Sequence, residues 1–88
     1  MLLSMPRLND MSTWTLRTKG GLRQFISGEG HWIEQNPAKN SRWAKLARKG
    51  HAVAWEFENR EGGGYTGRIQ VDGEIMTAKN AQERFLKR

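Results

Sequence analysis

Hydrophobic and polar residues alternate along several short stretches of the chain, which is the period-two pattern of half-buried β-strands. The clearest stretch is 51–58, where Val53, Trp55 and Phe57 alternate with small or charged residues. Related patterns cover residues 13–17, 22–27, 31–35, 65–71 and 74–76. Glycine-containing turns separate most of these stretches. The pattern therefore predicts five to six short strands.

The dipeptide Asp72-Gly73 predicts how the last two strands are joined. A two-residue hairpin turn needs positive φ at both central positions, and this dipeptide tolerates it. The resulting register pairs Val71 with Glu74 and Ile69 with Met76. We therefore expect Met76 to lie on the buried face of the sheet.

A first helix is predicted between residues 36 and 50. Asn36-Pro37 is a helix-start signal, and Gly50 can close the helix beyond its last turn. The apolar residues between them fall on one stripe at helical spacing: Trp43, Leu46 and Ala47.

A second short helix ends the chain. Either Thr77 caps it, or Asn80 does so together with Glu83 as a capping box. Its expected core contacts are Ala78, Ala81, Phe85 and Leu86. The order of elements is then βββαβββα. This order predicts an α+β fold in which two helices cover one face of an antiparallel sheet.

A chain of 88 residues has the length of one small domain. We predict one domain over residues 13–88 and a disordered leader over residues 1–12. Pro6 and Asp10 interrupt that leader, so it fits neither a secretory signal nor a membrane span. We therefore expect a cytoplasmic protein. The chain has no cysteine, which excludes disulfides and thiolate ligands, and we expect no metal or other cofactor.

The net charge is +6, with 15 Lys and Arg against 9 Asp and Glu. A basic surface favours a polyanionic partner, such as nucleic acid or an acidic protein. The positive excess is concentrated in the two predicted helices, and the candidate phosphate-binding residues are Arg42, Lys45, Arg48, Lys49, Lys79, Arg84, Lys87 and Arg88. If both helices lie on one face, these side chains form one positive surface. The alternative is two solvated helix faces.

One of the four tryptophans differs from the others. Trp14, Trp43 and Trp55 share their faces with apolar residues, which favours core positions. Trp32 follows a glycine turn and shares its face with Glu34. It is the best candidate for an exposed ring that stacks on a nucleic-acid base, and a partly buried position at the sheet edge is the alternative.

Few residues point to catalysis. A small basic ribonuclease could pair His31 or His51 with Glu56 or Glu58 for proton transfer. The spacing of these residues does not require that role, and we favour the simpler interpretation of a strand-edge histidine and two solvent-facing carboxylates. The glycine-rich stretches lead into strands, whereas a phosphate loop leads into a helix. We therefore predict that the protein is not an enzyme.

The stretch 64–74, followed by Thr77-Ala-Lys and Phe85-Leu-Lys, resembles the arm-binding domains of phage-type tyrosine recombinases. The resemblance covers residues 51–88 and implies a three-stranded sheet that is backed by one helix and inserted in a DNA groove. The chain departs from that family in a very short third strand and in the negative charge of Glu56 and Glu58. No site residue is carried over from this analogy.

The sequence therefore predicts a small non-enzymatic protein that contacts nucleic acid through its helical Lys and Arg clusters. The alternative is a protein-interaction or inhibitor module that uses a sheet edge or the loop 59–64. That alternative is motivated by the acidic residues of the predicted sheet, Glu56, Glu58, Asp72 and Glu74. The sequence leaves the oligomeric state open.

Overall fold

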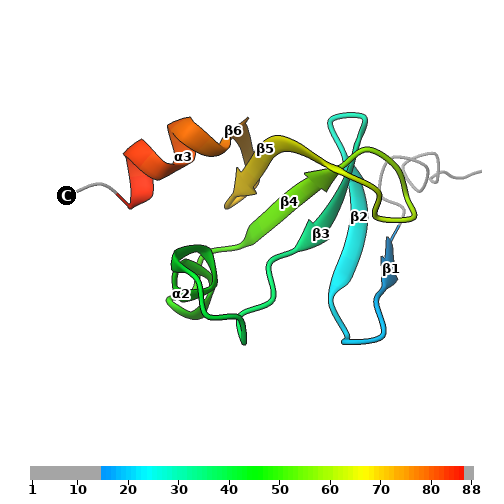
Figure 1. The fold of residues 1–88 in the computed structure, drawn as a ribbon, viewed down its shortest axis with the longest axis horizontal. Coiled ribbons are helices and arrows are strands. Elements are labelled where there is room, and N and C mark those ends of the chain that lie inside the picture. Colours follow the sequence, from blue (N-terminus) through cyan, green and yellow to red (C-terminus); the bar gives the residue numbers. More distant parts are fainter. Residues whose placement is uncertain (1–14, 87–88) are drawn as a thin grey trace, which may run out of the picture.

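Residues 15–86 fold into one antiparallel sheet with two helices on its surface (Figure 1). The computed structural model describes residues 15–86. The strands are β1 (Thr15–Arg17), β2 (Arg23–Ser27), β3 (Gly30–Glu34), β4 (Val53–Phe57), β5 (Tyr65–Val71) and β6 (Glu74–Thr77). The helices are α2 (Arg42–Arg48) and α3 (Ala78–Phe85). Strands adjacent in the chain are adjacent in the sheet, so the predicted α+β fold and its order βββαβββα are confirmed.

Three sequence predictions concern residues outside the described range. They are the disordered leader over residues 1–12, the core position of Trp14 and the phosphate-binding role of Lys87 and Arg88. The first strand is described from Thr15 onward.

Both helices pack on the same face of the sheet, which we call the helix face. Leu46 of α2 and Ala81 of α3 are buried in one cluster with Val53, Ile69 and Val71. Partly buried residues complete this cluster: Trp43, Ala47, Trp55, Met76, Phe85 and Leu86. The expected core stripe of the first helix and the buried position of Met76 are thus confirmed. For the second helix the cluster includes Ala81, Phe85 and Leu86 but not the expected Ala78. Figure 1 shows both helices at the end of the molecule farthest from β1.

The last hairpin has the predicted register. Val71 pairs with Glu74, and Ile69 pairs with Met76. Asp72 and Gly73 have φ values of 52° and 88°, as a turn with two left-handed central residues requires. The Thr77 hydroxyl accepts a hydrogen bond from the Asn80 backbone N–H at 3.1 Å, so Thr77, not Asn80, caps α3.

The predicted start of the first helix is wrong. The Ser41 hydroxyl caps α2 by accepting from the Ala44 backbone N–H at 3.1 Å. Asn36 instead forms a local turn, in which its side chain accepts from the Ala38 backbone N–H at 2.9 Å. The predicted end is confirmed, because Gly50 follows the helix with a φ of 110° and donates to the Ala47 carbonyl at 3.0 Å.

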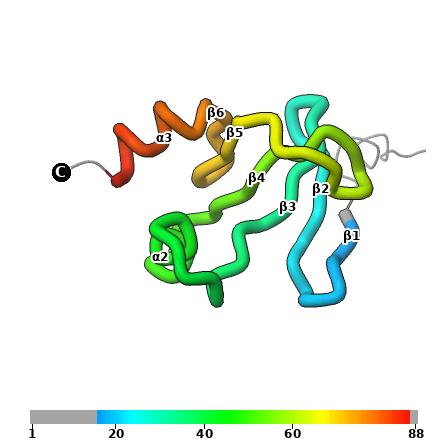
Figure 2. The backbone as a smooth tube through the Cα atoms, in the orientation of Figure 1, coloured from blue at the N-terminus to red at the C-terminus, as the bar shows by residue number. Residues whose placement is uncertain are grey.

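A second core lies on the opposite face, which we call the Trp32 face. Phe25, Trp32 and Ala54 are buried there, and Ile75 packs against them. The sheet curls so that the β2–β3 turn approaches β6, and a Cβ atom added to Gly28 would lie 2.9 Å from Cδ1 of Ile75. Figure 2 shows this turn and the long β4–β5 loop at the end of the sheet away from the helices.

The expectation of an exposed or edge-located Trp32 is wrong. Its exposed fraction is 0%, and its indole N–H donates to the Ser27 carbonyl at 2.8 Å. β3 is the third of six strands, so Trp32 has neighbours on both sides: it pairs with Phe25 of β2 and with Glu56 of β4. Trp32 is therefore a core residue and cannot stack on a base in this structure.

The expectation that Glu56 faces solvent is also wrong. Its exposed fraction is 7%, and its carboxylate accepts from the Arg68 guanidinium at 2.8 and 2.9 Å and from the Thr66 hydroxyl. The Arg68 hydrogen bonds lower the pKa of Glu56 most strongly, the Thr66 hydroxyl lowers it further, and burial opposes both. The guanidinium also lies 5.8 Å from the centre of the Trp32 ring, so Arg68 closes this part of the Trp32 face.

Candidate functional site

The exposed side of α2 carries a stripe of cations. Arg42, Lys45 and Lys49 are spaced by three and four residues, which places them on one side of a helix. All three are exposed, and none forms an ion pair with a carboxylate of residues 15–86. The helix itself contains no acidic residue. We call these three residues the α2 stripe.

Arg48 does not belong to this stripe. Its guanidinium donates to the carbonyl of Pro37 and, at 3.2 Å, to the carbonyl of Lys39. These contacts fasten the loop before α2 to the last turn of the helix. The predicted phosphate-binding role of Arg48 therefore competes with a structural role that the sequence did not reveal.

The cations of α3 are only partly available. Arg84 forms an ion pair with Glu74 at 2.7 Å, and hydrogen bonding to that carboxylate raises the pKa of Arg84. Lys79 is exposed and has no ion-pair partner in the described chain. The structure thus places the two helices on one face, as the prediction of a shared positive surface requires. It leaves most of the uncompensated charge on α2.

The two helices meet at a shallow hollow of about 290 Å³. Arg42 of α2 lines it together with Gln82, Glu83 and Leu86 of α3. Glu83 adds a negative charge here, which weakens the positive field between the helices. A phosphate backbone would therefore be attracted more strongly to Lys45 and Lys49 than to this junction.

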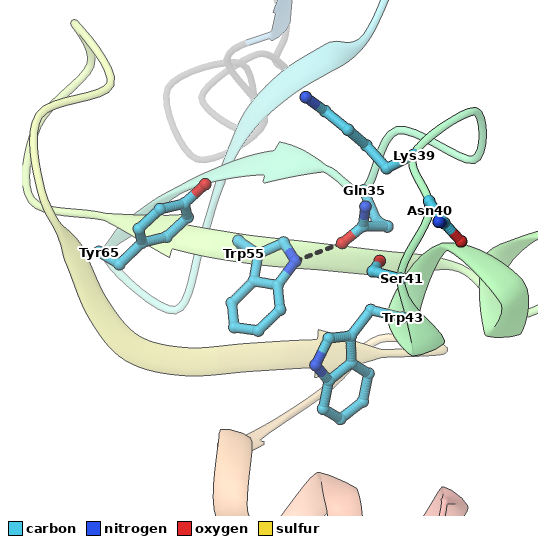
Figure 3. Close-up of a pocket in the computed structure, with 7 residues that line it drawn as sticks. All are labelled: Gln35, Lys39, Asn40, Ser41, Trp43, Trp55 and Tyr65. Carbon is cyan, nitrogen blue, oxygen red and sulfur yellow. Dashed lines mark hydrogen bonds between the residues drawn. The ribbon is translucent and has the colours of Figure 1, made fainter.

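An aromatic pocket of about 440 Å³ lies beside the start of α2 (Figure 3). Its apolar walls are Trp43, Trp55 and Tyr65, and Figure 3 shows Trp55 between the other two rings. Its polar lining comes from the segment between β3 and α2: Gln35, Lys39, Asn40 and Ser41. The pocket contains no lining carboxylate. We call it the aromatic pocket.

The rings of the aromatic pocket meet edge to face. The ring centres of Trp43 and Trp55 are 5.7 Å apart, and those of Trp55 and Tyr65 are 5.8 Å apart. The ring centres of Phe57 and Tyr65 are 4.7 Å apart, with the two ring planes tilted by 38°. Tyr65 is nonetheless 68% exposed, because the helices cover the other end of β5. This leaves a large aromatic side chain in solvent at the mouth of the pocket.

Gln35 fixes the orientation of the central ring. The Trp55 indole N–H donates to Oε1 of Gln35 at 2.5 Å, and Nε2 of Gln35 donates to the Asn36 carbonyl at 3.1 Å. The amide therefore links the ring to the backbone of the next loop. Such a network holds an aromatic surface in place before any ligand arrives.

The sequence pattern gives no prediction of this pocket as a site. It placed Trp43 and Trp55 in the core, and they do pack against the helix-face cluster while also lining the pocket. Tyr65 lies beside Trp55 and Phe57, and its exposure depends on how far the helices extend over the sheet. The signal available in the sequence was an aromatic residue directly after three glycines, at the start of a strand.

The acidic residues behind the alternative function are largely engaged within the chain. Glu56 binds Arg68, and Glu74 binds Arg84. Asp72 accepts from His51 at 2.7 Å and from the Ala52 backbone N–H at 2.9 Å; the histidine contact contributes most to lowering the Asp72 pKa. Among these four residues, Glu58 has an exposed side chain without an ion-pair partner in the described range.

The loop 59–64 folds on itself. The Asn59 side chain accepts from the backbone N–H groups of Glu61 and Gly63, at 3.0 Å each. The Glu58 N–H donates to the carbonyls of Gly63 and Gly64. The two edge strands, β1 and β6, have three and four residues, and short edges offer little room for pairing with another chain.

No family model, curated protein or solved structure matches this chain. The resemblance of residues 51–88 to recombinase arm-binding domains therefore gains no support from these comparisons, and β4, β5 and β6 belong to a six-stranded sheet. In residues 15–86, no group of three or more acidic or histidine side chains is placed to hold a metal ion. No helix in that range has the length and apolar character needed to cross a membrane.

Proposed function

We propose that this protein is a small non-enzymatic module that binds nucleic acid, with the α2 stripe contacting the phosphate backbone. The observation that carries the proposal is the position of Arg42, Lys45 and Lys49 on one exposed helix side, with none of the three in an ion pair with a described carboxylate. Cations in such a row neutralise successive phosphates and release the counterions condensed on them. The net charge of +6 adds a long-range attraction.

The proposal assigns different roles to the predicted cations. Lys45 and Lys49 are the principal phosphate contacts, and Arg42 and Lys79 extend the surface. Arg48 and Arg84 are already bound to carbonyl and carboxylate oxygens within the chain. Lys and Arg contacts to phosphate do not depend on the base sequence, so binding through this surface is expected to be non-specific.

The test is a charge reversal on the α2 stripe with a matched control. The test variant carries Lys45→Glu and Lys49→Glu, and the control carries Arg17→Glu at the end of β1 and Lys19→Glu in the β1–β2 turn. Arg17 donates to the Gly21 carbonyl at 2.7 Å, so the folding of the control is checked as closely as that of the test variant. Both variants change the net charge equally, and all four side chains are exposed. Affinity for a fluorescent oligonucleotide is measured by anisotropy from 50 mM to 400 mM salt, after circular dichroism has confirmed folding.

We expect the test variant to bind the oligonucleotide more weakly than the wild type does, and we expect its affinity to depend less on the salt concentration. Each lost phosphate contact lowers the slope of log K against log salt by about 0.7 for a single strand and about 0.9 for a duplex. If the wild type and the variant bind equally at 1 M salt, the loss of two contacts makes the variant bind about 25- to 60-fold more weakly than the wild type at 0.1 M salt. Equal losses in both variants, or no binding by the wild type, would reject the proposal. A polyglutamate chain that binds as tightly as the oligonucleotide would also reject nucleic acid as the ligand.

A further inference from the structure

We infer that the aromatic pocket binds an unpaired base of a single-stranded nucleic acid by stacking, beside the phosphates held by the α2 stripe. This inference rests on the proposed function and specifies the form of nucleic acid that the module recognises. It assigns a role to Tyr65, which phosphate binding does not use.

The first argument is the position of the pocket relative to the cations. Trp43, a wall of the pocket, directly follows Arg42 of the α2 stripe, and Lys39 lines the pocket itself. Aromatic faces beside a positively charged track are the arrangement by which proteins hold single strands, because bases stack while cations meet phosphates. One strand could therefore contact both surfaces along the start of α2.

The second argument is the chemistry of the lining. The side chains of Lys39 and Asn40 make no hydrogen bond to a described residue, so their donors and acceptors can meet a base edge or a phosphate. The absence of a carboxylate from the lining, together with the charge of Lys39, disfavours a cationic ligand. A volume of about 440 Å³ lies in the range of sites that hold small planar ligands.

The third argument is preorganisation. The hydrogen bond from Trp55 to Gln35 fixes the central ring, and Phe57 supports Tyr65. The edge-to-face contacts leave parts of the ring faces uncovered, and the 68% exposure of Tyr65 makes its ring accessible at the mouth. Figure 3 shows Tyr65 and Trp43 on opposite sides of Trp55, so a strand entering past Tyr65 would meet Trp55 next.

A duplex could not use this pocket without breaking base pairs, because its bases are already stacked and paired. The inference therefore predicts a preference for single strands over a duplex of equal phosphate number. It also predicts that a strand without bases keeps only the phosphate contribution to binding.

The experiment compares four probes of equal phosphate number: oligo(dT), oligo(U), an abasic strand and a duplex. Each is titrated against the wild type, Tyr65→Ala and Tyr65→Phe, with binding followed by anisotropy of the labelled probe and by tryptophan quenching. Leu16→Ala is the matched control, since Leu16 is the other large hydrophobic side chain of residues 15–86 that is strongly exposed.

Base stacking contributes enough per base that Tyr65→Ala should weaken oligo(dT) and oligo(U) binding by about 5- to 150-fold. Tyr65→Phe keeps the ring and should bind as the wild type does. Neither variant should alter the salt slope or the affinity for the abasic strand, because the α2 stripe is untouched. Leu16→Ala should bind all probes normally.

Three outcomes would overturn the inference. They are equal wild-type affinity for abasic and base-containing strands, equal affinity for duplex and single strand, and unchanged oligo(dT) binding by Tyr65→Ala. A proline-rich peptide that binds more tightly than oligo(dT), in a way that depends on Tyr65, would assign the pocket to a protein partner instead. Failure of all four probes to bind would reject the proposed function itself, so the two failures are distinguishable.

Discussion

The two faces of the sheet are buried by different means. The helix face has an aliphatic centre of Val53, Ile69 and Val71, and it is covered by residues of α2 and α3. The Trp32 face has no helix in its buried cluster, which consists of strand residues, and it holds the Glu56–Arg68 pair. The comparison shows how a chain of 88 residues can bury both sides of one sheet: added helices cover one face, and curling of the strands covers the other.

The two faces also differ in whether their polar and charged side chains point inward or toward solvent. The polar network on the Trp32 face is directed inward, since Glu56 binds Arg68 and Thr66 and the Trp32 N–H binds a backbone carbonyl. The helix face carries the exposed cations and the aromatic pocket on its outer parts. We therefore expect substitutions on the Trp32 face to change stability, and substitutions around α2 to change binding.

The largest expected effect comes from truncating the central residue of either core. Trp32→Ala should lower the free energy of unfolding by about 3–5 kcal/mol, and Ile69→Ala by about 2–5 kcal/mol, because each leaves a cavity. Both residues are 0% exposed. Chemical denaturation followed by circular dichroism and by tryptophan fluorescence would measure the two losses.

Strand β4 contributes Val53 to one core and Ala54 to the other. We therefore expect each variant to unfold in a single transition, with both probes coincident. Separate transitions would contradict this view of two cores joined in one cooperative unit. If Trp32→Ala does not fold, Trp32→Phe retains most of the ring and loses the hydrogen bond to Ser27, and it should be less stable than the wild type.

A smaller loss is expected from a single methyl group on the Trp32 face. A Cβ atom at Gly30 would lie 2.2 Å from Oε2 of Glu56 and 3.2 Å from the Trp32 indole nitrogen. Gly30→Ala should therefore displace the carboxylate from Arg68 and lower stability by about 1–3 kcal/mol. Gly20→Ala is the control, since its nearest atom is 3.8 Å away, and it should be neutral or slightly stabilising. Equal melting temperatures for the two variants would contradict the tight packing described here.

The smallest expected effect is a loss of stability that occurs only at acidic pH. The folded protein holds the pKa of Glu56 below its ordinary value of 4.5, chiefly through the Arg68 hydrogen bonds. A lowered pKa contributes stability that is present above the ordinary value and is lost as the pH falls through the folded value. We expect the melting temperature to be insensitive to this group between pH 7 and 5 and to fall below pH 4.5.

The variant Glu56→Gln separates this contribution from that of Asp72, whose pKa is also lowered. It should be less stable than the wild type at pH 7 and should show a shallower loss in acid. Asp72→Asn should keep the part of the acid loss that comes from Glu56. If the melting temperatures of the wild type and of Glu56→Gln depend on pH in the same way, the Glu56 carboxylate does not cause the loss of stability in acid.

Local patterns predicted much of the fold. The Asp72-Gly73 turn and the alternation on either side of it determine the register of β5 and β6, because hairpin pairing depends on neighbouring residues. The boundary of α2 was missed because Asn36 and Ser41 are both good capping residues, and Asn36 makes a local turn. Choosing between them needs the position of the loop in space.

The site was harder to predict because it depends on distant contacts. Trp32 has no apolar partner within its own strand, but Phe25, Ala54 and Ile75 come to it from three other strands. Arg48 and Arg42 have the same side chain. Only Arg48 lies within hydrogen-bonding distance of the carbonyls of the loop before α2. The sequence pattern locates the Lys and Arg residues along the chain, whereas the distinction between an inward and an outward cation requires the three-dimensional structure.

The Arg48 contacts with Pro37 and Lys39 tie the wall of the aromatic pocket to the helix that carries the cations. Lys39 and Trp43 therefore keep their spacing in the absence of a ligand, and an incoming strand would not have to order that segment on arrival. Under the proposed function, association would therefore cost less conformational entropy than it would with a free loop. Arg48 would in this way strengthen the proposed binding of nucleic acid without contacting the nucleic acid itself.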